Sequence, residues 1–409
     1  MLKKNYFSHL AAAAGLLGLL AIATQAFAAS QEQVLYSFCK TSGCPDGDAP
    51  AAGLVSDAAG NFYGTTYGGG QYNFGTVFQL TPNGNGTWTH TLLYSFGGYP
   101  EDSASPYAGL IFDSKGNLYG TTYNGGVFNG GTAFELSPGK KGAWTEQVLY
   151  SFGKDDAYFP MAGLIFDANG NLYGTAAFDV FELSPHRDGT RTEKPLCTVV
   201  GLSQAALVMD ASGNLYGTTV NGGSKSWGSV FECSRGKKGN WTATVLHSFK
   251  GKDGRFPVAG LIFDANGNLY GTTFKGGAGY PGAGVVFELS PGTNGKWTEN
   301  ILHTFQGGQD GAGPAAGLIF DASGNLYGTT WAGGSNYDAG TVFELSPGAN
   351  GTWTETVLHS FGGGTDGTEP IAPLILDGSG NLYGTTSLGG AYHNCDEGNA
   401  CGTVFEVTP

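Results

Sequence analysis

Six loops of the chain place an aspartate four residues before a proline, and a carboxylate repeated at one position could bind a cation. The six are Asp46, Asp102, Asp156, Asp253, Asp310 and Asp366. Because Ca²⁺ prefers oxygen ligands, a ring of these carboxylates around a channel mouth would be a candidate calcium site. The alternative is an Asx turn, in which each carboxylate bonds its own backbone. We favour the turn, because six identical turns need no ion, and we keep Ca²⁺ as the one cofactor to test.

Aromatic side chains recur in a second set of loops, which carry a GG…G segment. They are Tyr72, Phe74, Phe128, Trp227, Tyr280, Trp331, Tyr337 and Tyr392. An exposed aromatic face can stack on a sugar ring or dock a protein partner. The alternative is that these rings fold back as lids over their own glycine-rich loops. The sequence leaves both interpretations open.

No residue pattern indicates a catalytic centre. Three histidines share one position of a repeated VLxSF string with three tyrosines: His247, His303 and His359 against Tyr36, Tyr94 and Tyr150. A position that accepts either ring is typical of packing rather than of a general base. No GxSxG, phosphate-binding loop or HExxH string is present. We therefore name no catalytic residue and favour a binding protein over an enzyme.

The six cysteines indicate an oxidising compartment. Four of them lie near the two ends of the repeat region and could pair locally or with each other: Cys39, Cys44, Cys395 and Cys401. Cys197 and Cys233 fall in adjacent repeats, where a bridge between repeats is possible. The spacing alone does not choose among these pairings.

A seven-residue string, GNLYGTT, recurs with small changes seven times. Its tyrosines are Tyr63, Tyr119, Tyr173, Tyr216, Tyr270, Tyr327 and Tyr383. Residues 316–361 give a full copy with four strand-like pieces: AGLIFD, NLYGTT, GTVFEL and WTETVLHSF, which we name strands a to d. Four short strands per repeat of this length indicate the blade of a β-propeller. The turn before strand b, with its Asp and Gly, is typical of a tight hairpin. We expect Leu and Tyr of strand b to pack on opposite neighbouring blades, and the following Gly to let the next sheet approach.

The two ends of the repeat region are offset by one strand. The last copy stops at strand c, VFEV (404–407), and the first apolar strand, VLYSF (34–38), is a strand d without a preceding a, b and c. If residues 33–38 complete the last blade, seven blades close into a ring, and closure covers what would otherwise be two exposed sheet edges. We predict an all-β fold, a seven-bladed propeller of four-stranded blades closed by its N-terminal strand.

The strings GNLYGTT, GTVFEL and VLHSF resemble the tandem repeats of exported bacterial proteins called GloVer (Gloeobacter–Verrucomicrobia) repeat proteins. The resemblance covers nearly all of residues 34–408. It implies an exported, propeller-like protein, and it implies no established activity and no catalytic residues.

Residues 1–28 read as a secretory signal peptide, with Lys3 and Lys4 before an apolar run and an AFA string (26–28) at the cut. This leaves 29–409 as a single propeller domain that is secreted, periplasmic or at the cell surface. The net charge of −14 argues against nucleic acid and anionic membranes as partners. We expect no membrane span after signal removal, and a monomer.

The sequence favours a binding module for a glycan or a cell-envelope partner. Two alternatives remain: a metal-assisted polysaccharide lyase or hydrolase using the Asp-lined channel mouth, and a structural envelope protein.

Overall fold

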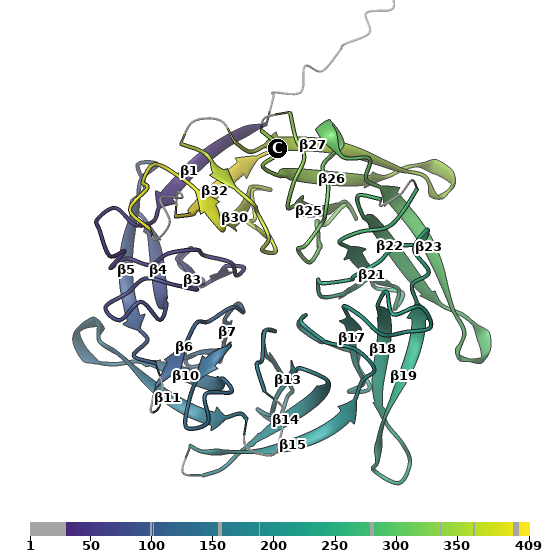
Figure 1. Cartoon of the computed structure of the whole chain (residues 1–409), viewed down its shortest axis with the longest axis horizontal. Coiled ribbons are helices and arrows are strands. Elements are labelled where there is room, and N and C mark those ends of the chain that lie inside the picture. The colour runs from purple at the N-terminus through teal and green to yellow at the C-terminus, as the bar shows by residue number, and fades with distance from the viewer. Residues whose placement is uncertain are drawn as a thin grey trace, which may run out of the picture.

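The computed structural model of the chain is a ring of seven four-stranded antiparallel sheets (Figure 1). It describes residues 30–98, 100, 102–153, 158–187, 189–278, 282–335, 337–362, 365–395 and 401–409. Within these residues the helical elements are four short 3₁₀ turns: η1 (Lys140–Gly142), η2 (Thr293–Gly295), η3 (Gly308–Asp310) and η4 (Ala349–Gly351). None of them has the length or apolar character needed to cross a membrane. The predicted all-β, seven-bladed propeller is confirmed.

The two inner strands of each blade carry the AGLIFD and NLYGTT strings. Strand a is β2 (Val55–Ser56), β7 (Ile111–Phe112), β12 (Ile165–Phe166), β16 (Val208–Met209), β20 (Ile262–Phe263), β24 (Ile319–Phe320) and β29 (Ile375–Leu376). Strand b is β3 (Phe62–Thr66), β8 (Leu118–Thr122), β13 (Leu172–Ala176), β17 (Leu215–Thr219), β21 (Leu269–Thr273), β25 (Leu326–Thr330) and β30 (Leu382–Thr386). Every residue of every strand b is buried.

The two outer strands are longer. Strand c is β4 (Thr76–Pro82), β10 (Thr132–Pro138), β14 (Asp179–Pro185), β18 (Ser229–Arg235), β22 (Val285–Pro291), β26 (Thr341–Pro347) and β32 (Thr403–Thr408). Strand d is β5 (Trp88–Ser95), β11 (Trp144–Ser151), β15 (Arg191–Thr198), β19 (Trp241–Ser248), β23 (Trp297–Thr304), β27 (Trp353–Ser360) and β1 (Gln31–Ser37). Two small ladders tie loops together, β6 (Ser103–Ala104) with β9 (Asn124–Gly125) and β28 (Gly367–Thr368) with β31 (Leu388–Gly389).

The turn between strands a and b is built by one aspartate. Asp57 Oδ1 accepts the backbone N–H of Ala59 and of Asn61, while Oδ2 accepts Asn61 Nδ2–H and the hydroxyl of Tyr63. Gly60 occupies the left-handed region at φ +80°, as a tight turn of this kind requires. These hydrogen bonds stabilise the ionised carboxylate and hold the pKa of Asp57 below its usual value, although partial burial opposes the shift. The Tyr of the repeated string is thus tied to the turn that precedes it.

Strand b joins each blade to both neighbours. Tyr63 of blade 1 packs in one buried cluster with Leu110 and Leu118 of blade 2, so the Leu and Tyr of the string face opposite blades, as expected. The first Thr of the string adds a hydrogen bond, because Thr65 Oγ1 donates to the carbonyl oxygen of Ala108 in the next blade. The corresponding Thr makes the same bond in blades 2, 3, 4, 5 and 7.

The Gly of the string has a different partner from the one expected. A Cβ on Gly120 would lie 2.7 Å from Phe134 Cζ and 3.0 Å from Leu110 Cδ2. Phe134 is the register partner of Gly120 on strand c of the same blade. The glycine therefore makes room for a phenylalanine ring of its own blade rather than for the next sheet.

The N-terminal strand closes the ring. β1 pairs with β32 from Gln31 opposite Thr408 to Ser37 opposite Thr403, and the two lie side by side in Figure 1. Thr385 Oγ1 of blade 7 also donates to the carbonyl oxygen of Ala52 in blade 1. The predicted closure is confirmed, and the contact between the last and first blades matches the other interfaces.

Replacing Gly120 with Ala should destabilise the fold by about 1–3 kcal/mol, because the new methyl group overlaps the Phe134 ring. Gly378→Ala is the matched control: a Cβ there meets no atom within 4 Å, and five other copies of the repeat carry Ala at this position. Chemical denaturation of both variants measures the difference. Equal stability of the two would show that the glycine is not required for packing.

Deleting Gln31–Phe38 should lower the free energy of unfolding by roughly 5 kcal/mol, because it removes buried Leu35 and Phe38 and exposes the edge of β32. A chain beginning at Gln31 is the control. Urea unfolding measures the change, and an unchanged midpoint would contradict closure by this strand.

Candidate functional site

A cavity of about 790 Å³ lies on the central axis, surrounded by the inner strands. Each blade contributes the residues of its AGLIF segment, such as Ala52 to Val55 and Ala108 to Ile111. Because this segment hardly varies between copies, the cavity wall is aliphatic on all sides. A wall of this kind can bury an apolar surface, and it holds few groups that could transfer a proton.

On the side of the d–a and b–c loops, three aromatic residues line the mouth of the cavity: Tyr107, Phe274 and Trp331. Tyr67 and Tyr107 make an edge contact between blades 1 and 2, with centroids 6.1 Å apart. Phe274 and Trp331 lie 5.9 Å apart between blades 5 and 6. Figure 1 places these two pairs of blades across the axis from each other. Tyr67, Tyr107 and Trp331 are each about two-fifths exposed, at 40%, 37% and 38%.

Two polar residues line the same cavity as these rings. Glu369 supplies the only carboxylate, and Gln204 an amide, among the described residues that line the cavity. Glu369 is held by its backbone, which donates to the carbonyl oxygen of Ala339 and accepts the N–H of Ser387. The site therefore combines an aliphatic wall, three aromatic rings at the mouth and two polar residues.

The eight aromatic residues expected at the rim are divided by the structure. Trp331 lines the cavity. Phe74 and Trp227 fold over glycines of their own blades, and a Cβ on Gly98 or Gly251 would lie 2.7 or 2.5 Å from the respective ring. Phe128 lies beside Gly153, Tyr72 and Tyr337 are exposed, and Tyr392 lies at the ring seam. Tyr280 lies outside the described residues.

Sequence reasoning missed Tyr67, Tyr107 and Phe274. Tyr67 and Phe274, like Trp331, directly follow strand b, where the other copies carry Tyr123, Ala177, Val220 and Ser387. Tyr107 directly precedes the AGL of strand a. The useful signal was variation at the two positions that flank an otherwise constant string.

The repeated aspartates are placed at the outer strands and not at the channel mouth. None of the five described aspartates lines the cavity. Each described one contacts the Tyr or His of the VLxSF string: Tyr36 donates to Asp46 at 2.7 Å, Tyr94 to Asp102 at 3.2 Å, and the histidines lie against Asp253, Asp310 and Asp366 at 3.3, 2.9 and 3.0 Å. Backbone N–H groups of the same loops also bond these carboxylates, for example Cys39 N–H to Asp46. Asp156 lies outside the described residues.

The next blade adds a third group to each pair, and we name the resulting cluster the outer contact. The third group lies on the neighbouring strand d, two residues before its VLxSF string: His90, Glu146, Glu299, Glu355 or Glu32. Burial, together with the adjacent aspartates, raises the pKa of Glu299 and of Glu146 to about 8, and of Glu32 and Glu355 to about 7. Burial lowers the pKa of His90 to about 4. The histidines of the VLxSF string are therefore more than packing residues, since each one contacts a carboxylate.

One blade interface has a disulfide in place of the outer contact. Cys197 occupies the Tyr/His position of blade 3 and is bonded to Cys233 of blade 4. Ala243 stands where other copies carry the buried Glu, and the loop at 201–205 has no aspartate. Ala243 packs against the same buried cluster as the two cysteines.

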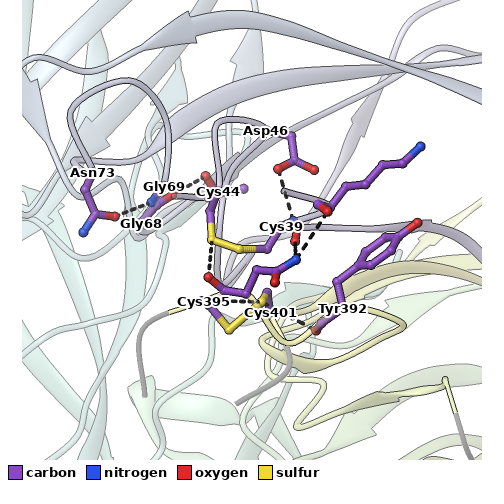
Figure 2. Close-up of a disulfide and its surroundings, with 12 residues drawn as sticks. Cys39, Cys44, Asp46, Gly68, Gly69, Asn73, Tyr392, Cys395 and Cys401 are labelled. Atoms are coloured by element: carbon purple, nitrogen blue, oxygen red, sulfur yellow. Dashed lines mark hydrogen bonds between the residues drawn. A yellow bond between two sulfur atoms is a disulfide. The ribbon is translucent and has the colours of Figure 1, made fainter. Parts of the chain in front are cut away.

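Two further disulfides lie at the seam of the ring. Cys39 pairs with Cys44 and Cys395 with Cys401, which selects the local pairing among those left open by the sequence (Figure 2). Asn394 links the two loops, since its Nδ2–H donates to the carbonyl oxygen of Cys39 at 3.0 Å. Three disulfides in one chain are typical of proteins outside the reducing cytoplasm.

Solved structures with the same ring architecture have varied functions. Virginiamycin B lyase from Staphylococcus aureus is 15% identical, with 93% of this chain and 99% of that chain covered at a TM-score of 0.58. A streptogramin B lyase is 16% identical, with 93% and 97% covered at a TM-score of 0.57. The extracellular domain of a hybrid two component system from B. thetaiotaomicron is 10% identical, with 92% and 39% covered at a TM-score of 0.57. At such low identity these likenesses show the fold alone.

The sequence itself matches a repeat family. No curated protein has a matching sequence. The family described as the Gloeobacter/Verrucomicrobia repeat matches residues 20–180 and 178–394, which together cover most of the chain. This agrees with the resemblance of the GNLYGTT, GTVFEL and VLHSF strings. The chain belongs to the Gloeobacter/Verrucomicrobia repeat family.

Proposed function

We propose that this chain is an exported binding module that takes a glycan at the mouth of its central cavity. The observation that carries the proposal is the set of aromatic rings on opposite sides of that mouth: Tyr107, which packs against Tyr67, and the contacting pair Phe274 and Trp331. These rings are partly exposed although the wall beneath them is buried and aliphatic.

The chemistry of the mouth suits a sugar. The faces of a pyranose ring carry C–H groups that pack on aromatic faces, while its edge carries hydroxyls that need hydrogen-bond partners. Phe274 and Trp331 supply faces, and Tyr107 supplies a face with a hydroxyl. Glu369 and Gln204 supply acceptors and a donor within the same cavity lining. A neutral or cationic ligand fits best, because the chain has a net charge of −14.

The compartment follows from the same proposal. Export through the signal peptide at residues 1–28 would place the propeller in the periplasm, at the cell surface or in the medium, where glycans are abundant and disulfides persist. The three disulfides support this location. We propose that the exported chain acts as a monomer, since pairing of β1 with β32 completes the seventh blade and leaves no blade with an unpaired strand c.

Binding without turnover is favoured over catalysis. A lyase or hydrolase acting in this cavity would need an acid and a base near the ligand. The described lining has one carboxylate, and the repeated aspartates are engaged at the outer contacts. A calcium ion held by a ring of aspartates therefore has no support from their placement.

The test is titration of the purified exported chain with a panel of neutral and cationic oligosaccharides, in Ca²⁺ and in EDTA. We expect binding in both buffers. Trp331→Ala or Tyr107→Ala should weaken it about tenfold, equivalent to about 1.4 kcal/mol for the loss of one stacked ring. Tyr337→Ala is the matched control, because Tyr337 is 89% exposed and does not line the cavity.

Three outcomes would contradict the proposal. Loss of binding in EDTA would show that binding depends on a metal ion. Bond cleavage in the oligosaccharide would make the chain an enzyme. Absence of any hit, together with self-association or capture of an envelope protein, would favour a structural or protein-binding role.

A further inference from the structure

Two outer contacts bring the ligand atoms of a His, an Asp and a Glu within 4.8 Å of one another: His247, Asp253 and Glu299 between blades 4 and 5, and His359, Asp366 and Glu32 between blades 6 and 7. The contact between blades 4 and 5 differs in the distances around its histidine. His247 Nε2 lies 3.3 Å from Asp253 Oδ2 and 3.5 Å from Glu299 Oε2. At the next interface His303 Nε2 lies 2.9 Å from Asp310, and at the one after it His359 Nε2 lies 3.0 Å from Asp366. The latter two distances are those of ordinary hydrogen bonds, whereas the first two are longer than the usual 2.9–3.0 Å.

We propose that His247, Asp253 and Glu299 form a zinc-type binding site that crosslinks blades 4 and 5. Their three ligand atoms lie within 4.8 Å of one another, and they come from strand d of blade 4, the following loop and strand d of blade 5. The site is distinct from the sugar-binding mouth, since none of the three residues lines the cavity.

The distances match tetrahedral zinc coordination. Zn²⁺ binds histidine nitrogen and carboxylate oxygen at ~2.0–2.2 Å, and two ligands of a tetrahedron with such bonds are roughly 3.3–3.6 Å apart. The separations of 3.3 and 3.5 Å around His247 Nε2 fall in this range. Three protein ligands leave the fourth position for a water molecule.

The buried atoms lack other partners. His247 Nε2 and Glu299 Oε1 are both buried without a hydrogen bond. In the ligand form, with both carboxylates ionised and the imidazole neutral, the three groups carry a formal charge of −2, which a divalent cation balances. The backbone N–H of Lys250 donates to Asp253 Oδ1 at 2.6 Å. This hydrogen bond fixes the orientation of the carboxylate, whose other oxygen, Oδ2, faces His247. The side chains remain 11–19% exposed, which gives an ion access from solvent.

The choice of zinc over calcium follows from the imidazole. Ca²⁺ takes six to eight oxygen ligands, whereas a nitrogen ligand with two carboxylates suits Zn²⁺ and neighbouring transition metals. The preceding interface supports a crosslinking role, because blades 3 and 4 are joined by the Cys197–Cys233 disulfide at the same position.

The test uses the full exported chain, stripped with EDTA, re-equilibrated with Zn²⁺ and freed of excess metal. We expect one zinc per chain by elemental analysis and a higher unfolding temperature than in EDTA. His247→Tyr should abolish zinc retention, and it should fold, because tyrosine occupies this position in Tyr36, Tyr94 and Tyr150. Glu299→Gln, a nearly isosteric change, should weaken zinc binding at least tenfold.

His303→Tyr is the matched control, since it makes the same change at the interface between blades 5 and 6. We expect it to retain one zinc per chain. Failure of the unsubstituted chain to retain zinc would overturn the proposal, as would zinc retention that survives both His247→Tyr and Glu299→Gln. Displacement of zinc by millimolar Ca²⁺ would also contradict it.

Discussion

The structure depends on one constraint: no blade of this chain can bury both of its faces alone. The Tyr of each strand b lies in the hydrophobic cluster of the following blade, and the Leu of that strand lies in the cluster shared with the preceding one. The adjacent Thr bonds a carbonyl oxygen across the same interface in six of the seven blades. A first and a last blade would each leave an apolar face in water, so the chain is stable as a closed ring.

The closing strand follows from the same constraint. β1 and β32 are the two ends of the repeat region, yet they pair as strands d and c of one blade. This interlocking makes the last blade depend on both ends of the chain. The two seam disulfides and Asn394 then hold the adjoining loops together.

The outer contacts show how one position can be filled by different chemistry. Tyr with Asp, His with Asp and Glu, and a disulfide all join neighbouring blades at the same place. At the disulfide, three changes occur together, since Cys197 replaces the ring, Ala243 replaces the glutamate and the loop lacks its aspartate. They belong together because a buried Glu or Asp without its partners would be costly, and an alanine removes that cost. The residues of the inner wall, by contrast, hardly vary between blades. Differences in side-chain chemistry between blades are therefore found at the mouth and at these outer contacts.

Much of the fold could be predicted from the sequence, because the residues that define each repeat lie close together in the chain. The Asp and Asn of DAAGN, four residues apart, are joined by a hydrogen bond that builds the turn, and the seven repeated tyrosines give the number of blades. The one-strand offset between Val34 and Val407 then predicts closure. The partner of the repeated Gly was assigned to the next sheet, because the sequence does not show that Phe134 pairs opposite Gly120 in its own blade.

The candidate sites depended on the tertiary structure. Asp253 and Glu299 are 46 positions apart and in different blades, so no spacing in the sequence links them. Likewise, Phe274 and Trp331 meet only because two b strands from successive blades converge on one axis. The sequence by itself determined the blade, the number of blades and their closure, since each rests on contacts between residues near in the chain or repeated at a fixed interval. Which side chains face the channel and which meet between blades was decided by the curvature of the ring, which brings distant copies of the same position together.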